Sequence, residues 1–194
     1  MGSESRLATF SVGGGEAPAI EPDHPRRRWQ IVALVAMAAL GHIGWEHFNG
    51  GIQAHHLFQR ADMPAISNAW GVVLLPALAW FLSGRFLKRA VDAHSARNIG
   101  IGFAAALLVG VALMASFLSG LESASFYLLL GAILSGFVVR VYRGEYILGF
   151  VLGMTVAVGP VIATLAALFI AGISAIAHRV LWPAVIWVVG RVRR

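Results

Sequence analysis

Residues 29–48 read WQIVALVAMAALGHIGWEHF, and this run decides the class of fold. The hydrocarbon core of a bilayer is about 30 Å thick, so an α-helix crosses it with about 20 mostly apolar residues. Glu46, close to the end of the run, is its one acidic side chain. The run therefore predicts a membrane-spanning helix near the N-terminus.

The composition of the whole chain points to the same class. Of its 194 residues, 58% are hydrophobic and 12% are charged, and the mean hydropathy is +0.76. A soluble domain carries about 25% charged residues. The 15 Lys and Arg residues outnumber the 9 Asp and Glu residues, and they cluster between apolar runs instead of forming one basic face. This composition excludes a typical cytosolic enzyme, a disordered chain and a nucleic-acid-binding module. The lack of cysteine excludes disulfides and thiolate metal sites.

Further apolar runs predict an all-α integral membrane protein, a bundle of five transmembrane helices or six, within residues 29–194. A turn at Gly159-Pro160 inside lipid would leave backbone groups unpaired, so we expect one long, kinked fifth helix there. Residues 178–194 then form either a C-terminal interfacial helix or a sixth span. The expected spans cover residues 29–48, 66–86, 98–118, 125–141 and 145–177.

The basic residues predict how the bundle is oriented. Lys and Arg gather just before the first span, in residues 85–97 and in residues 140–143, whereas the loop after the first span has only Arg60. Positive charge stays on the cytoplasmic side, so we expect residues 1–28, rich in Gly, Pro and Glu, to form a disordered cytoplasmic tail. The C-terminal arginines favour the same side, which favours a sixth span. Small size, charge asymmetry and the lack of cysteine indicate a bacterial inner membrane.

Residues 42–70, HIGWEHFNGGIQAHHLFQRADMPAISNAW, are a polar exception that holds four of the seven histidines. His42 and Glu46 are one helical turn apart and share a face. Asp62 before Met63-Pro64 predicts the N-cap of the second helix. An ionisable residue inside a span is costly, so Glu46 should face the bundle interior and have a partner. By orientation, this cluster faces the periplasm.

Three hypotheses account for this cluster. In the structural one, Glu46 and His42 pair with each other or with Arg60 or Asn68 and pin the loop to the bundle. In the second, the cluster binds a divalent metal such as zinc, which accepts imidazole and carboxylate ligands. In the third, His42 and Glu46 handle a proton or a polar substrate in a carrier or an accessory subunit. The metal-ligand candidates are His42, Glu46, His47, His55, His56 and Asp62, and the ligand-binding candidates are His42, Glu46, Arg60 and Asn68.

An enzymatic alternative follows from a resemblance. Glu46 and Ser67-Asn68 resemble a pattern of the ceramidase and progestin/adipoQ-receptor-like membrane hydrolases, which pair an early-span Glu with a Ser/Asn motif opening the next span. The resemblance implies a zinc-dependent hydrolase at the outer lipid interface, with Glu46 or Asp62 as general base. It covers about thirty residues, and the late-span H-x-x-x-H of that superfamily is represented only by His178. For that reason we do not transfer the activity.

The sequence therefore predicts a small multi-pass membrane protein with no established catalysis and with a His/Glu cluster that binds a metal or a polar ligand. Its expected surroundings are the lipid bilayer, without nucleic acid. Small residues such as Gly149 and Gly153 recur at a spacing that permits close approach of helices. Such helix faces serve either contact with a homo-oligomer or membrane-complex partner, or packing between helices of the same chain. Packing within the chain is favoured.

Overall fold

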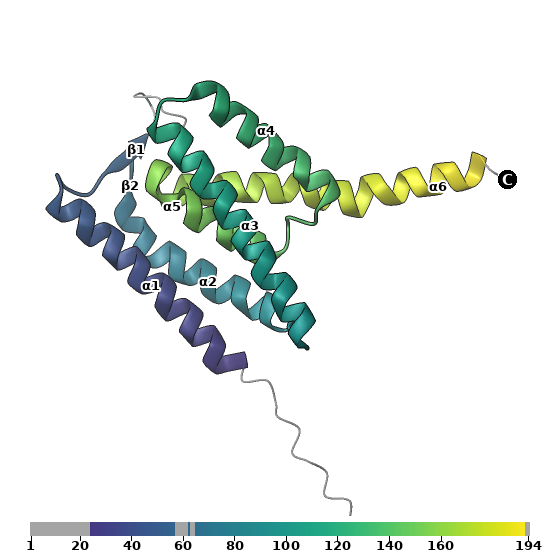
Figure 1. Ribbon diagram of the computed structural model, residues 1–194, viewed down its shortest axis with the longest axis horizontal. Coiled ribbons are helices and arrows are strands. Elements are labelled where there is room, and N and C mark those ends of the chain that lie inside the picture. Colours follow the sequence, from purple (N-terminus) through teal and green to yellow (C-terminus); the bar gives the residue numbers. More distant parts are fainter. Residues whose placement is uncertain (1–23, 57–61, 63–64, 193–194) are drawn as a thin grey trace, which may run out of the picture.

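The computed structural model describes residues 24–56, 62 and 65–192, and most of these are helical. Helices α1 to α5 gather in a bundle, and α6 projects from it (Figure 1). Four helical stretches of the described residues are long and apolar enough to cross a membrane, which supports an all-α membrane protein. They are Pro25–Phe48, Asn68–Leu87, Ala93–Leu118 and Gly144–Arg191.

The chain alternates helices with short connections. The helices are α1 (His24–Phe48), α2 (Gly71–Leu87), α3 (Ala93–Leu118), α4 (Glu122–Val138), α5 (Gly144–Ile176) and α6 (Trp182–Val192). Between α1 and α2, strands β1 (Ala54–His56) and β2 (Ala65–Ser67) form an antiparallel hairpin in which His55 lies opposite Ile66. A 3-10 turn, η2 (Asn68–Trp70), follows β2, and a π-helical turn, η3 (Ala177–Leu181), joins α5 to α6.

The start of the second helix differs from the sequence prediction. We expected a helix from residue 66 capped by Asp62, but residues 65–67 pair with β1 and α2 begins at Gly71. Ser67 caps the 3-10 turn η2 that leads into α2, because its hydroxyl accepts a hydrogen bond of 3.2 Å from the amide of Ala69, and Trp70 at the start of α2 makes no side-chain cap. The prediction of Asp62 as N-cap is therefore wrong, because strand pairing delays the helix.

Small residues bring α3 and α5 into backbone contact. A Cβ atom at Gly153 would lie 2.5 Å from the carbonyl oxygen of Leu107, and one at Gly110 would lie 2.6 Å from that of Phe150. Neither position has room for a side chain, and Gly149 meets the backbone of Phe103 in the same way. Close approach of this kind stabilises helix pairs in lipid. The expectation that Gly149 and Gly153 serve packing within the chain is confirmed.

Helix α5 breaks at Gly159, and the chain reverses there. Gly159 has φ 80° and ψ 161°, which is not helical, and Pro160 follows it. Before the break, Gly144 packs on Leu82 near the end of α2. After it, the Ser174 hydroxyl donates a hydrogen bond of 3.1 Å to the carbonyl of Val139, just past the end of α4. Both ends of α5 thus lie at the same end of the bundle.

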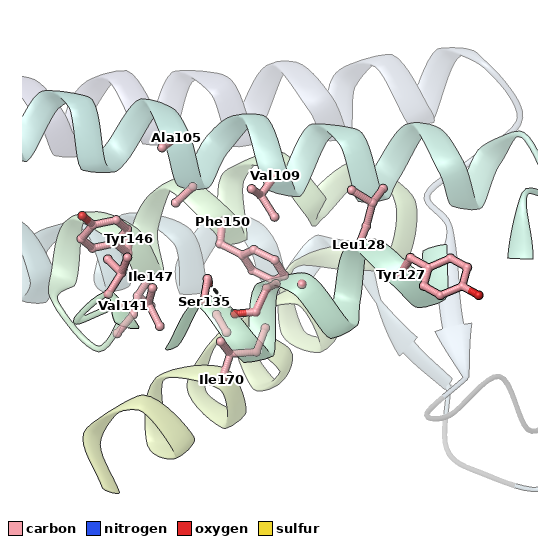
Figure 2. Close-up of a pocket in the computed structure, with 15 residues that line it drawn as sticks. Ala105, Val109, Tyr127, Leu128, Ser135, Val141, Tyr146, Ile147, Phe150 and Ile170 are labelled. Atoms are coloured by element: carbon pink, nitrogen blue, oxygen red, sulfur yellow. Dashed lines mark hydrogen bonds between the residues drawn. The ribbon is translucent and has the colours of Figure 1, made fainter. Parts of the chain in front are cut away.

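Two further observations agree with this reversal. Ile147 and Phe150 from the first half of α5 line one apolar pocket together with Ile170 from the second half (Figure 2). Beyond α5, the Trp182 indole donates a hydrogen bond of 3.0 Å to the carbonyl of Phe137 at the end of α4. The expectation of one long fifth helix needs correction, because a glycine with positive φ followed by a proline turns the chain back.

The bundle thus has two distinct ends. The hairpin end holds β1, β2, the end of α1 and the break in α5. The arginine end holds the connection between α2 and α3, the start of α5, and Arg85, Arg89, Arg97 and Arg143. The core between them is apolar, and its buried side chains include Val35, Ala39, Leu75, Ala79, Leu82, Leu148 and Val151.

Candidate functional site

The last turns of α1 carry a buried carboxylate to the hairpin end. Glu46 is 5% exposed, and its Oε1 lies 3.2 Å from Nε2 of His42 on the same helix face. This arrangement follows from their spacing of four residues. The four-residue spacing predicts the shared face, and the cost of a charge inside a span predicts the inward direction of Glu46. The structure brings them together as expected.

The hairpin supplies the other partners of Glu46. The side-chain amide of Asn68 donates a hydrogen bond of 2.5 Å to Oε1, and the backbone amide of Gln53 donates one of 3.1 Å to Oε2. Asn68 in turn donates its backbone amide to the carbonyl of Gln53 at 2.9 Å. The chain reaches this position through Gly50 and Gly51, which have φ of 117° and 99°. Glu46 therefore joins α1, the hairpin and η2.

The break in α5 packs directly against this carboxylate network. A Cβ atom at Gly159 would overlap Oδ1 of Asn68 and would lie 3.1 Å from Cδ2 of the His55 ring. Gly159 is thus needed both for its positive φ and for the absence of a side chain. Residues far apart in sequence, Glu46 in α1 and Gly159 in α5, meet on the two sides of Asn68.

Three buried side-chain atoms at this place make no hydrogen bond within the described part of the chain. They are Nε2 of His42, Nε2 of His55 and Oδ1 of Asn68. The His42 nitrogen lies within ion-pair distance of Glu46, but its direction does not meet hydrogen-bond geometry. A buried polar atom left without a partner costs about 1–3 kcal/mol. Two of these atoms belong to residues that contact Glu46, and the third belongs to His55 beside Gly159.

A small cavity adjoins the carboxylate network. It measures about 140 Å³ and lies between α1, α2 and the first half of α5. His42 and Asn68 provide its polar edge, and Thr155, Val156 and Pro160 come from α5. The Thr155 hydroxyl donates to its own helix, to the carbonyl of Val151 at 2.6 Å. The remaining wall is apolar, from residues such as Ala39 and Leu75.

The other predicted site residues take different places. His47 is exposed and makes an edge-on ring contact with Phe48 at 5.4 Å, and Asp62 is exposed. Arg60 and the side chain of His56 lie outside the described residues, so their predicted roles stay predictions. Among the described residues, no three His, Asp or Glu side chains are placed to share a metal ion. The structure thus brings together His42, Glu46 and Asn68, with His55 on the far side of Asn68.

Sequence reasoning missed a second buried carboxylate, at the arginine end. Glu145, in the first turn of α5, is 2% exposed and pairs with the guanidinium of Arg89. The sequence signal available for a buried ion pair at Glu145 was an acidic residue at a helix start with arginines nearby. It was not decisive, because the same pattern is common on solvated helix ends.

No family model, curated protein or solved structure matches the chain. The function is therefore argued from the geometry of the site.

The contact between Asn68 and Glu46 can be tested by charge. Asn68→Asp would place a second carboxylate against Glu46, and two carboxylates this close cannot both be ionised without strong repulsion. We expect this variant to lose about 3–5 kcal/mol of stability at pH 8. We expect a smaller loss at pH 5, where the pair can share a proton. Thermal unfolding in detergent at the two pH values, each relative to wild type, measures the difference.

Asn68→Ala is the matched control, because it removes the hydrogen bond and adds no charge. Its loss of stability should be the same at both pH values. If Asn68→Asp also loses the same stability at pH 8 and at pH 5, the two side chains are not in contact.

Proposed function

We propose that the protein is a multi-pass membrane protein that binds a small cation carrying N–H donors, such as ammonium or a primary amine, beside Glu46. The observation that carries this proposal is a buried carboxylate next to a cavity of about 140 Å³ whose polar edge comes from His42 and Asn68, the two side chains in contact with that carboxylate. A liquid water occupies about 30 Å³. The cavity therefore suits a ligand of a few heavy atoms.

The chemistry of the surrounding atoms favours a donor over an acceptor. Oδ1 of Asn68 only accepts hydrogen bonds, as do both carboxylate oxygens of Glu46. Val156 lines the cavity, and its carbonyl cannot receive the usual helical hydrogen bond from residue 160 because Pro160 has no N–H. A buried carboxylate also needs positive charge nearby. A cation with several N–H groups satisfies all of these groups together.

The broken helix supports the same proposal. In membrane transporters, cations and substrates bind where a helix is interrupted, because the unwound backbone offers groups that a continuous helix keeps occupied. Here the interruption at Gly159 lies against Asn68, which itself contacts Glu46. Backbone and side-chain acceptors therefore come together at one place.

The interior of the bundle favours binding over transport. A proton-coupled carrier needs polar groups leading from Glu46 to the arginine end. The described residues between the two ends include the buried apolar side chains of Ala79, Leu82, Leu148 and Val151. A zinc hydrolase needs three protein ligands, and the described His, Asp and Glu side chains offer no such group. Neither alternative is supported as well as cation binding.

We also propose six crossings, with both chain ends on the cytoplasmic side of a bacterial inner membrane. The six segments are α1, α2, α3, α4 and the two halves of α5, which alternate in direction. Support comes from the arginine end, because positive charge is retained in the cytoplasm. The hairpin end, with Glu46, then faces the periplasm.

Cation binding can be measured as stabilisation of the purified protein in detergent. A ligand at a concentration 100-fold above its Kd stabilises the folded state by about 2.7 kcal/mol. We expect ammonium and methylammonium chloride to raise Tm by several degrees over choline chloride at equal ionic strength. Glu46→Gln keeps the shape of the side chain and removes its charge, so it should abolish this rise.

Glu122→Gln is the control, because Glu122 is an exposed carboxylate at the start of α4. It should respond to ammonium as the wild type does. Equal Tm shifts in wild type and Glu46→Gln would refute a site at Glu46. A larger Glu46-dependent shift with zinc chloride than with ammonium would refute the ligand class and assign the site to a metal ion.

The proposed topology can be tested with single cysteines, because the chain has none of its own. The exposed positions Ser123, His94 and Arg191 suit this purpose. In intact bacterial cells, we expect a membrane-impermeant maleimide to label Ser123→Cys and to leave His94→Cys and Arg191→Cys unmodified. Labelling of Arg191→Cys together with Ser123→Cys would indicate an odd number of crossings.

A further inference from the structure

A wide apolar groove runs between α3, α4 and α5. It measures about 430 Å³, and its walls include Val109 from α3, Leu128 from α4, and Phe150 and Ile170 from α5 (Figure 2). It opens at the side of the bundle, since a Cβ atom at the lining residue Gly131 would meet nothing within 4 Å. A lateral apolar opening in a membrane-spanning bundle faces lipid chains.

A polar pocket adjoins this groove at the arginine end. It measures about 240 Å³ and is lined by Arg89, Ser95, Asn98, Arg143, Glu145 and Tyr146 among others. Tyr146 lines the apolar groove as well. The groove and the pocket therefore meet at one side chain, with an apolar part toward the middle of the bundle and a polar part at its end.

The side chains that line the polar pocket include two arginines and one carboxylate. Arg89 pairs with the buried Glu145, which leaves the guanidinium of half-buried Arg143 as the excess charge. Arg143 makes no ion pair with any residue that the structure describes. Asn98 adds a neutral donor for a hydrogen bond to an anion, whereas Ser95 hydrogen-bonds the carboxylate of Asp92. Arginine suits phosphate in particular, because its planar fork donates two parallel hydrogen bonds.

We propose that the groove and the polar pocket together bind one anionic phospholipid from the leaflet at the arginine end. Its phosphate lies beside Arg143, and one acyl chain lies in the groove between α3 and α4. Charge complementarity at one end and an apolar groove that shares Tyr146 with the pocket favour a lipid over a soluble anion, which would use the pocket alone. Basic pockets between transmembrane helices bind lipid headgroups in this way. This site is independent of the cation site at Glu46, which lies at the opposite end of the bundle.

The test uses the full chain, delipidated in detergent and titrated with phosphatidylglycerol or phosphatidylcholine while Tm is followed. We expect phosphatidylglycerol to bind the wild type at least fivefold more tightly. Arg143→Gln should remove this preference, whereas Arg140→Gln, an exposed arginine that lines neither the groove nor the pocket, should retain it. Equal affinity of the wild type for the two lipids would overturn the proposal, as would equal effects of the two arginine variants.

A second pair of variants tests the acyl chain and stays informative if Arg143→Gln fails to fold. Ala105→Trp would fill the groove that Ala105 lines, whereas neighbouring Ala104 is exposed and does not line it. We expect Ala105→Trp to weaken binding of both lipids at least fivefold and Ala104→Trp to leave it unchanged. If glycerol 3-phosphate alone stabilises the wild type as much as phosphatidylglycerol does, the site binds a soluble anion and the lipid proposal is wrong.

Discussion

The reversal of the chain at Gly159-Pro160 is the constraint on which the rest of the structure depends. Pro160 removes one helical hydrogen bond, and Gly159 adopts a positive φ that other residues rarely adopt. The second half of α5 consequently returns along the bundle and brings Ser174 to the carbonyl of Val139. Without that return, the apolar groove would lose the wall that includes Ile170, and α4 would keep only its contact with α3.

The same reversal shapes the polar site at the opposite end. A break in a membrane helix must place its freed backbone groups near polar partners, because lipid offers none. Here it lies against Asn68, and Asn68 donates to the carboxylate of Glu46. One helix break therefore shapes two features: the carboxylate network at the hairpin end, and the apolar groove between α3, α4 and α5.

The sequence predicts the local features of this protein better than it predicts the path of the chain through the bundle. The length of the apolar runs predicts a membrane protein, and the spacing of His42 and Glu46 predicts that they share a helix face. Each of these predictions depends only on residues within one helix. The reversal was not predicted, since the cost of a turn in lipid depends on partners such as Asn68, some ninety residues earlier in the chain. Strand pairing delayed α2 and displaced the predicted cap at Asp62. The burial of Glu145 likewise depends on Arg89 from a distant helix.

The most direct test of the reversal is a disulfide between the two segments that it brings together. A Cβ atom at Gly136 would lie 3.3 Å from that of Ser174, close to the spacing in disulfides. A continuous helix would instead carry Ser174 about 45 Å from Gly144. Oxidation of Gly136→Cys/Ser174→Cys in membranes should protect both thiols from a maleimide, as read by mass spectrometry. The control pair Gly136→Cys/Gly172→Cys should keep both free. Free thiols in the first pair, or equal protection in both, would contradict the reversal.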